Sequence, residues 1–265
     1  MTEIKKTLAT LKARWAEATL IIGLNVLLVF SNKLFRIEKS KLTPILPLLF
    51  FISTITLMVI WILLNSGFLR TAYLEGDKRQ PLIVLLKTGM RFFGRVFRLG
   101  LLLLLIYFPL IWLTYSATKL FTSVNTSFFA TARSSPLLYQ FYFTIPYLIL
   151  IKPLLLMPAI IIVLDCKVLE SFKFLKKCKL FDAKGLLILA LISIILNFSW
   201  TILPKLNESL TISQFLLKNF SSVLMQFIRL MIAIAAVRFV ASLNLVYDVQ
   251  PVEDSQKHTN GNLKE

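Results

Sequence analysis

The chain has 265 residues, of which 57% are hydrophobic and 16% are charged, and its mean hydropathy is +0.77. A soluble domain has about 45–50% apolar and about 25% charged residues, so these values exclude an ordinary water-soluble globule. A net charge of +17 would favour nucleic-acid binding in a soluble protein. Because the basic residues lie between apolar blocks, we instead expect membrane lipids, and no nucleic acid, as partners.

Six apolar runs have about the 17–25 residues that a helix needs to cross a bilayer. They predict an all-α fold, a polytopic membrane bundle of about six transmembrane helices. We assign residues 1–248 to a single integral-membrane domain. Residues 249–265 have no apolar periodicity and are expected to form a disordered cytoplasmic tail. The six runs are 16–32, which is marginal in length, 45–69, 98–117, 138–163, 185–203 and 219–243.

Two basic segments between these runs are predicted to be amphipathic elbow helices, at 81–98 and 167–184. In each segment the basic residues recur at helical spacing, and Leu and Phe fill much of the remaining surface. A helix of this kind lies in the membrane interface, so we expect these basic stripes to contact the phosphates of anionic lipids. The stripes are Lys87, Arg91, Arg95 and Arg98 in the first segment and Lys173, Lys177 and Lys184 in the second.

The two elbow segments align with each other at an offset of 86 positions, and residues 4–15 resemble them faintly. The chain can therefore be divided into three possible internal repeats, 4–69, 81–163 and 167–243, each an interfacial helix followed by two spans. Internal repeats are common in membrane folds.

Residues Glu75, Gly76 and Asp77 follow the second apolar run. They predict a tight turn in which Gly76 supplies a positive φ, ahead of the elbow helix that begins near Pro81. A gate or a contact with a partner is the alternative interpretation.

The distribution of lysine and arginine predicts the orientation in the membrane, because cytoplasmic loops carry an excess of these residues. One set of alternate connections, counted with the two termini, has 20 basic residues, and the other set has 8. Both termini are therefore expected in the cytoplasm, and the protein is expected to be a multi-pass protein of the inner or cytoplasmic membrane.

Two cations lie inside the predicted spans. Lys152 precedes Pro153 near the middle of the fourth run, and Arg229 lies about a third of the way into the sixth. A charge at the centre of a membrane helix costs roughly 2.5–3.5 kcal/mol on insertion scales, which makes both residues candidates for a functional anion site. Alternatively, Lys152 bonds carbonyls that the prolines leave free, and Arg229 extends toward the outer interface.

Residues suited to catalysis are scarce. The single histidine, His258, lies in the predicted tail, and Cys166 and Cys178 are twelve positions apart with no histidine nearby. No glycine-rich phosphate loop occurs, and no carboxylate pair lies within an apolar run. We therefore expect no enzymatic activity, no cofactor and no metal site.

Two motifs resemble a broad group of poorly characterised prokaryotic membrane proteins, which includes the membrane domain attached to some glycerophosphodiester phosphodiesterases. They are R-T-A-Y-L-E-G at 70–76 and L-D-C-K-V-L-E-S-F-K-F at 164–174. The resemblance implies a six-span bundle with interfacial elbow helices. It supplies no catalytic residues, because the phosphodiesterase domain itself has no counterpart in this sequence.

Two functions remain open from the sequence. The first is a non-enzymatic scaffold or accessory protein that acts at anionic lipid or envelope machinery, with a membrane-protein partner or a second copy of the chain. The alternative is a transporter or transporter subunit in which Lys152 and Arg229 line an anion path.

Overall fold

The computed structural model describes residues 2–37, 45–122, 136–202, 212–243 and 245, and within these residues the fold is all-helical. The predicted tail at 249–265 lies outside the described residues. The described elements are α1 (Thr2–Ala13), α2 (Trp15–Ile37), α3 (Ile45–Glu75), α4 (Leu82–Thr122), α6 (Pro136–Ile149), α7 (Ile151–Leu164), α8 (Val168–Lys177), a short 3₁₀ turn η1 (Leu180–Asp182), α9 (Lys184–Ile202) and α10 (Ile212–Ser242).

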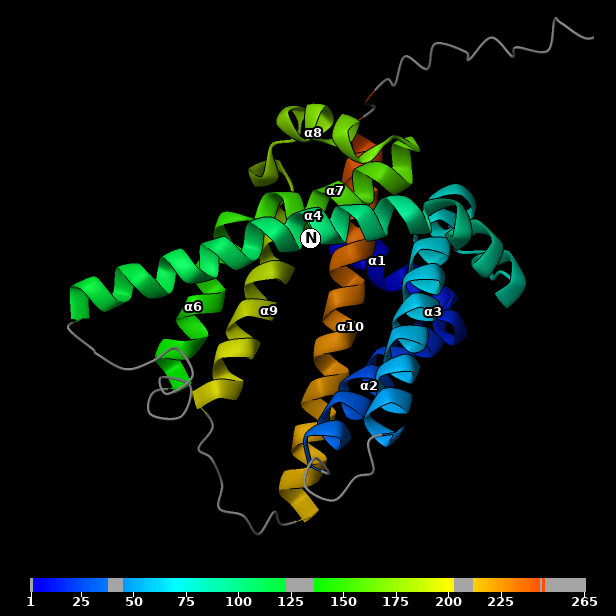
Figure 1. The fold of residues 1–265 in the computed structure, drawn as a ribbon. Helices are drawn as coiled ribbons and strands as arrows, with labels where there is room; N and C mark the ends of the chain where they lie inside the picture. The colour runs from blue at the N-terminus through cyan, green and yellow to red at the C-terminus, as the bar shows by residue number, and fades with distance from the viewer. Residues whose placement is uncertain (1, 38–44, 123–135, 203–211, 244, 246–265) are drawn as a thin grey trace, which may run out of the picture.

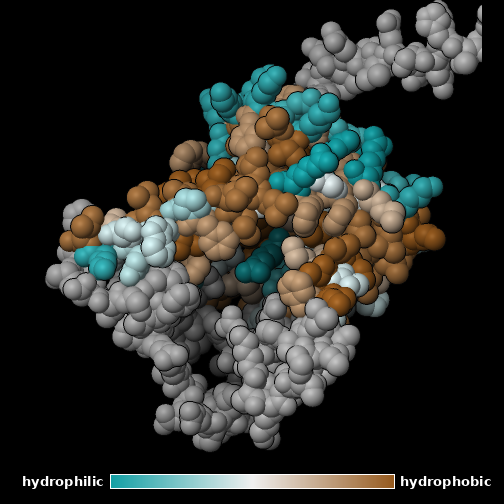
Figure 2. Space-filling view, in the orientation of Figure 1, coloured by the Kyte–Doolittle hydropathy of each residue, from teal (hydrophilic) through white to brown (hydrophobic). Residues whose placement is uncertain are grey.

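The helices form a bundle that α4 crosses. In Figure 1, α3, α9 and α10 run up the view, whereas most of α4 lies across it, and α8 covers the upper end. Figure 2 shows hydrophobic residues spread over the face that α4 presents and hydrophilic residues gathered around the end where α8 lies. This separation of an apolar flank from a polar end is typical of a protein embedded in a bilayer.

Helix α7 is the centre of the core. It packs against α10, α8, α4 and α3, and seven of its fourteen residues are buried. Its sequence is almost wholly apolar, with isoleucines at 160, 161 and 162 that are all at most 1% exposed. A helix that is apolar on every side is stable only where other helices surround it, or in lipid.

Helices α3 and α4 approach each other at very close range through two glycines. A Cβ atom added at Gly67 would lie 1.9 Å from the carbonyl oxygen of Leu85, and one added at Gly89 would lie 1.9 Å from that of Leu63. No side chain fits at either position. Small residues that allow backbones to approach are a common basis of helix association in membranes, where apolar burial alone gives little driving force.

The predicted elbow helix at 81–98 and the predicted span at 98–117 belong to one helix, because α4 continues without a break from Leu82 to Thr122 over 41 residues. Gly94 and Gly100 weaken a helix only slightly, and Pro109 is accommodated inside it. At about 1.5 Å per residue α4 is roughly 60 Å long, about twice the thickness of a hydrocarbon core.

The proline-rich run at 138–163 is broken, as its composition suggests. Helices α6 and α7 meet at Leu150 with a bend of 54°. A proline lacks the N–H that continues the helical ladder, and its ring crowds the preceding turn. Pro146 and Pro153 stand on either side of the break.

Three described helices are long and apolar enough to cross a membrane, and the bent pair α6 and α7 makes a fourth if it counts as one span. Trp15–Leu28 and Lys184–Leu196 are shorter apolar helices beside stretches that are not described. These features indicate a multi-pass membrane protein. The three long segments are Phe50–Glu75, Leu82–Leu120 and Ser222–Ser242.

The turn predicted after the second apolar run is confirmed, because Gly76 has a φ of 63°. Helix α4 begins at Leu82, one residue after Pro81. Helix α8 begins at Val168, which is 86 positions beyond Leu82, the same offset as in the predicted repeat. The two helices differ afterwards, since α8 ends at Lys177 while α4 continues.

Candidate functional site

Helix α8 forms a basic surface at the polar end of the bundle. Phe172, Phe174 and Leu175 pack against the core, whereas two large apolar residues beside the lysines point away from it: Leu169 is 75% exposed and Phe181 is 84% exposed. We call this region the α8 surface. It consists of Leu169 and Phe181 with the exposed lysines Lys167, Lys173, Lys176, Lys177, Lys179 and Lys184.

The start of α8 is fixed locally, which holds this surface in place. The Glu170 carboxylate accepts the backbone N–H of Lys167 at 2.8 Å. An acidic residue in the first turn satisfies a free amide and favours the positive end of the helix dipole. Lys176 and Lys177 lie in the last turn, where cations are favoured for the same reason.

The first predicted stripe is divided between two roles. Lys87 and Arg98 are exposed, but Arg91 and Arg95 both form ion pairs with Asp165, which follows α7. Arg95 also donates a hydrogen bond to the Asp165 carbonyl oxygen at 2.9 Å. Arg91 and Arg95 therefore join α4 to the α7–α8 turn, and their positive charge is partly neutralised within the chain.

Asp165 is suited to this joint by its backbone. Its φ is 55°, in the left-handed region that aspartate tolerates better than most residues.

Arg70 satisfies the C-terminal end of α7. Its Nη1 donates hydrogen bonds to the carbonyl oxygens of Ile162 and Val163, the latter at 2.8 Å. Carbonyls at a helix C-terminus have no partner within the helix, so a cation there is stabilising.

Cys166 and Cys178 are buried and unpaired at the two ends of the α8 segment. Burial raises the pKa of the Cys166 thiol to about 11, and the negative charge of Glu170 adds to the effect. Burial also raises the pKa of Cys178, against a smaller opposing effect of the Lys152 charge. Both thiols are therefore protonated at neutral pH, which is typical of structural cysteines.

Lys152 lies in the first turn of α7, just after the break, and its side chain is half-buried. Its influence on Cys178 places it near the end of α8. Among the described residues Lys152 donates no hydrogen bond to a carbonyl, so the alternative in which it bonds the freed carbonyls stays a prediction. Lys152 is not among the described residues that line the cavity beside Arg229.

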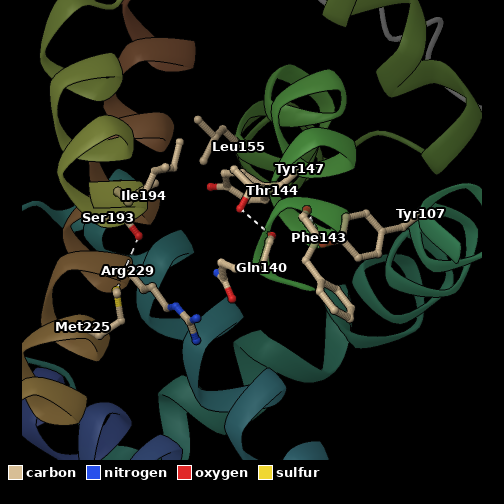
Figure 3. Close-up of a pocket in the computed structure, with 11 residues that line it drawn as sticks. Tyr107, Gln140, Phe143, Thr144, Tyr147, Leu155, Ser193, Ile194, Met225 and Arg229 are labelled. Carbon is tan, nitrogen blue, oxygen red and sulfur yellow. Dashed lines mark hydrogen bonds between the residues drawn. The ribbon is translucent and has the colours of Figure 1, made fainter. Parts of the chain in front are cut away.

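Arg229 lines a cavity of about 300 Å³ between α4, α6, α9 and α10. Its side chain is exposed to this space, and Figure 3 shows its guanidinium and the Gln140 amide directed into the same opening. Among the described residues neither side chain has a hydrogen-bond or ion-pair partner. The other lining residues are Tyr107, Phe143, Thr144, Tyr147, Leu155, Ser193, Ile194, Met225 and Ile232.

Three of the four hydroxyl groups that line the cavity already donate to acceptors within the protein. Tyr107 donates to the Phe143 carbonyl oxygen at 2.9 Å. Thr144 donates to the Gln140 carbonyl oxygen at 3.0 Å (Figure 3). Ser193 donates to the sulfur of Met225 at 3.5 Å. The uncommitted polar groups are thus those of Arg229, Gln140 and Tyr147.

The sequence did not single out Arg14, a buried cation that entered only the count of basic residues. It lies at the joint between α1 and α2 and is 0% exposed. Its guanidinium bonds Glu17, with Nε to Oε2 at 2.7 Å, and Thr71 at 2.8 Å, and it stacks over Phe68. The signal was the spacing of three between Arg14 and Glu17, which brings opposite charges together on one helix face.

Gln140, Tyr147 and Asp165 were also not predicted as site residues. Gln140 is a polar residue inside an apolar run, which was a usable signal, and Asp165 directly follows a span.

No protein-family model matches the chain, and neither does any curated protein or solved structure. The resemblance noted for residues 70–76 and 164–174 therefore stays a prediction.

Proposed function

We propose that this chain is a six-span protein of the cytoplasmic membrane, with both termini in the cytoplasm, that acts without enzymatic activity as a scaffold or accessory protein at anionic lipid. The bias of 20 basic residues against 8 supports this orientation. In this orientation the α8 surface lies at the cytoplasmic interface, where anionic lipids collect. A membrane-protein partner or a second copy of the chain would be recruited to the same region.

The observation that carries the proposal is the composition of the α8 surface. Residues 167–184 contain six lysines against Glu170 and Asp182, and Glu170 is occupied in closing the helix start. Exposed lysines around the exposed Leu169 and Phe181 give cations for phosphates and apolar side chains for the acyl boundary. This combination is the usual basis of interfacial binding.

The two predicted stripes contribute unequally to this function. The lysines of α8 are exposed, as are Lys87 and Arg98, whereas Arg91 and Arg95 already pair with Asp165. Anionic lipid binding is therefore proposed to depend on α8 more than on the middle of the α4 stripe.

Transport of an anion is the second candidate function, and the cavity beside Arg229 favours it. A path lined by both intramembrane cations is less well supported, because Lys152 is not among the described residues that line the cavity. Arg229 alone would have to attract the anion.

The test measures lipid binding by the purified full-length chain in mild detergent. Native mass spectrometry is recorded while phosphatidylglycerol or phosphatidylcholine is added to the wild type and to Lys173→Gln/Lys176→Gln/Lys177→Gln. Each lysine near an anionic surface contributes about 1 kcal/mol, so the triple variant is expected to bind phosphatidylglycerol at least tenfold more weakly, with phosphatidylcholine binding unchanged.

The matched control removes the same charge elsewhere. Lys5→Gln/Lys6→Gln/Lys12→Gln changes three exposed lysines of α1 and is expected to reduce phosphatidylglycerol binding less than the α8 variant does. Equal losses in the two variants would assign the binding to net charge and contradict a specific role for α8. Unchanged binding in the α8 variant would overturn the proposal.

A further inference from the structure

We propose that the cavity between α4, α6, α9 and α10 is a binding site for the phosphate group of an anionic amphiphile, with Arg229 as its counter-ion. This site is separate from the α8 surface, so the inference goes beyond the function proposed above. The same phosphate chemistry could be presented by a membrane lipid or by a small soluble phosphate ester, and the experiment distinguishes these sources.

The negative charge of the proposed ligand follows from the hydrogen-bond donors in the cavity that have no acceptor among the described residues. An arginine guanidinium has five N–H donors and no acceptor. The described residues that line the cavity include no carboxylate, and the hydroxyls of Tyr107, Thr144 and Ser193 already donate to protein acceptors. A group with several acceptor oxygens and a negative charge complements this surplus of donors, and phosphate matches the planar fork of arginine.

Gln140 and Tyr147 are the second and third contacts of the proposed site. Both come from α6, opposite Arg229 on α10, and neither side chain has a hydrogen-bond partner among the described residues. An amide N–H₂ and a phenol O–H can each donate one more hydrogen bond to a phosphate oxygen. Figure 3 shows Gln140 and Arg229 extending toward each other across the opening, with room between them.

The rest of the lining indicates an amphiphile rather than a bare ion. Leu155, Ile194, Met225 and Ile232 line the same cavity as the polar groups. A space of about 300 Å³ is at the lower end of ligand pockets, so it accommodates a headgroup and not two acyl chains. The chains would lie outside, along the exposed apolar face of α4, where Leu105 and Trp112 are 72% and 63% exposed.

The depth of Arg229 supports the same reading. It lies within the apolar segment Ser222–Ser242, seven residues and about 10 Å from its start. A cation at this depth without an acidic partner is a default candidate for a functional contact. A bound phosphate would supply the missing negative charge.

The experiment uses the full-length protein, stripped of lipid in mild detergent, with dioleoyl phosphatidylglycerol, dioleoyl phosphatidylcholine and glycerol 3-phosphate as probes. Thermal melting and native mass spectrometry are recorded for the wild type, Arg229→Met, Arg229→Lys and Lys152→Met. We expect one tightly held phosphatidylglycerol per wild-type chain and a rise in melting temperature. Arg229→Met is expected to weaken this binding at least tenfold, Arg229→Lys less, and Lys152→Met, the matched intramembrane cation outside the cavity, not at all.

The probes separate the two ligand sources. If glycerol 3-phosphate raises the melting temperature as much as the lipid does, and the rise depends on Arg229, the ligand is a soluble phosphate ester. If only the lipid raises it, the ligand is an amphiphile. The α8 triple variant should keep the single tight lipid, and the tenfold loss expected of the α8 surface should appear in the further phosphatidylglycerol molecules that bind after it. Failure of this site and failure of the α8 surface are therefore distinguishable.

Two further variants keep the proposal testable if Arg229→Met does not fold. Gln140→Leu and Tyr147→Phe each remove one proposed donor and are expected to weaken phosphatidylglycerol binding severalfold. Binding that is equal in the wild type and in all cavity variants would falsify the proposal.

Discussion

Arg14, at the joint between α1 and α2, and Arg229, on α10, have opposite environments in the fold. Arg14 is 0% exposed, pairs with Glu17, bonds Thr71 and stacks over Phe68. Arg229 projects into a cavity and has no bonded partner among the described residues. A charge out of water needs a counter-charge, and within the described residues one is found for Arg14 but not for Arg229.

The reason lies in the neighbouring positions of each helix. Glu17 is three residues beyond Arg14, which places the carboxylate on the same face. Its second oxygen accepts the backbone N–H of Gln80 at 2.7 Å, so the pair also holds the turn before α4. The corresponding positions around Arg229 carry no acid: they are Met225, Gln226, Ile232 and Ala233. We conclude that Arg14 is structural and that Arg229 is available to a ligand.

The largest expected effect is the loss of Arg14. Arg14→Met would leave the Glu17 carboxylate buried, at 7% exposure, without its counter-charge, and breaking a buried pair in this way costs about 3–5 kcal/mol. We expect a sharp fall in melting temperature and in the yield of monodisperse protein in detergent.

The control for this prediction is Arg14→Met/Glu17→Gln, which removes both charges and keeps an acceptor for Gln80. It should recover most of the lost stability, because a neutral pair no longer carries an uncompensated charge. If Arg14→Met melts like the wild type, the contrast between the two arginines does not hold.

A smaller effect is expected at the joint between α4 and α7. Asp165→Asn retains a residue that tolerates positive φ but removes the ion pairs with Arg91 and Arg95. These arginines are 64% and 32% exposed, so each pair contributes only about 0.2–1 kcal/mol. Melting at low and high salt should show a difference from the wild type that shrinks as salt screens the charges.

The two freed guanidiniums give this variant a second readout. Arg91 and Arg95 would become available to lipid phosphates, so Asp165→Asn is expected to bind phosphatidylglycerol more strongly than the wild type. Weaker binding would indicate that Asp165 holds the basic surface in its active arrangement.

The smallest effect on stability is expected at Arg229. In lipid-free detergent, Arg229→Met removes a cation that has no hydrogen-bond or ion-pair partner among the described residues. The free energy of unfolding should therefore change by no more than about 0.5 kcal/mol, and the melting temperature should stay close to that of the wild type. The same variant loses phosphatidylglycerol binding, as stated above. A large loss of stability without lipid would make Arg229 a structural residue like Arg14.

The sequence determined the features that depend on residues near one another in the chain. The apolar runs predicted an all-helical membrane protein, the glycine after Glu75 predicted the turn, and the prolines of residues 138–163 accompany the break at Leu150. These outcomes follow from backbone preferences and from the cost of placing polar groups in lipid, which act over a few residues.

Only the tertiary structure decided which charges remain free. Arg91 meets Asp165 across 74 positions, Arg14 meets Thr71 across 57, and Arg229 lines a cavity whose described lining does not include Lys152. Periodicity places a side chain on a face of its helix, but it does not say which helix packs against that face. That packing depends on contacts such as Gly67 against Leu85, in which close fit between distant segments selects one arrangement.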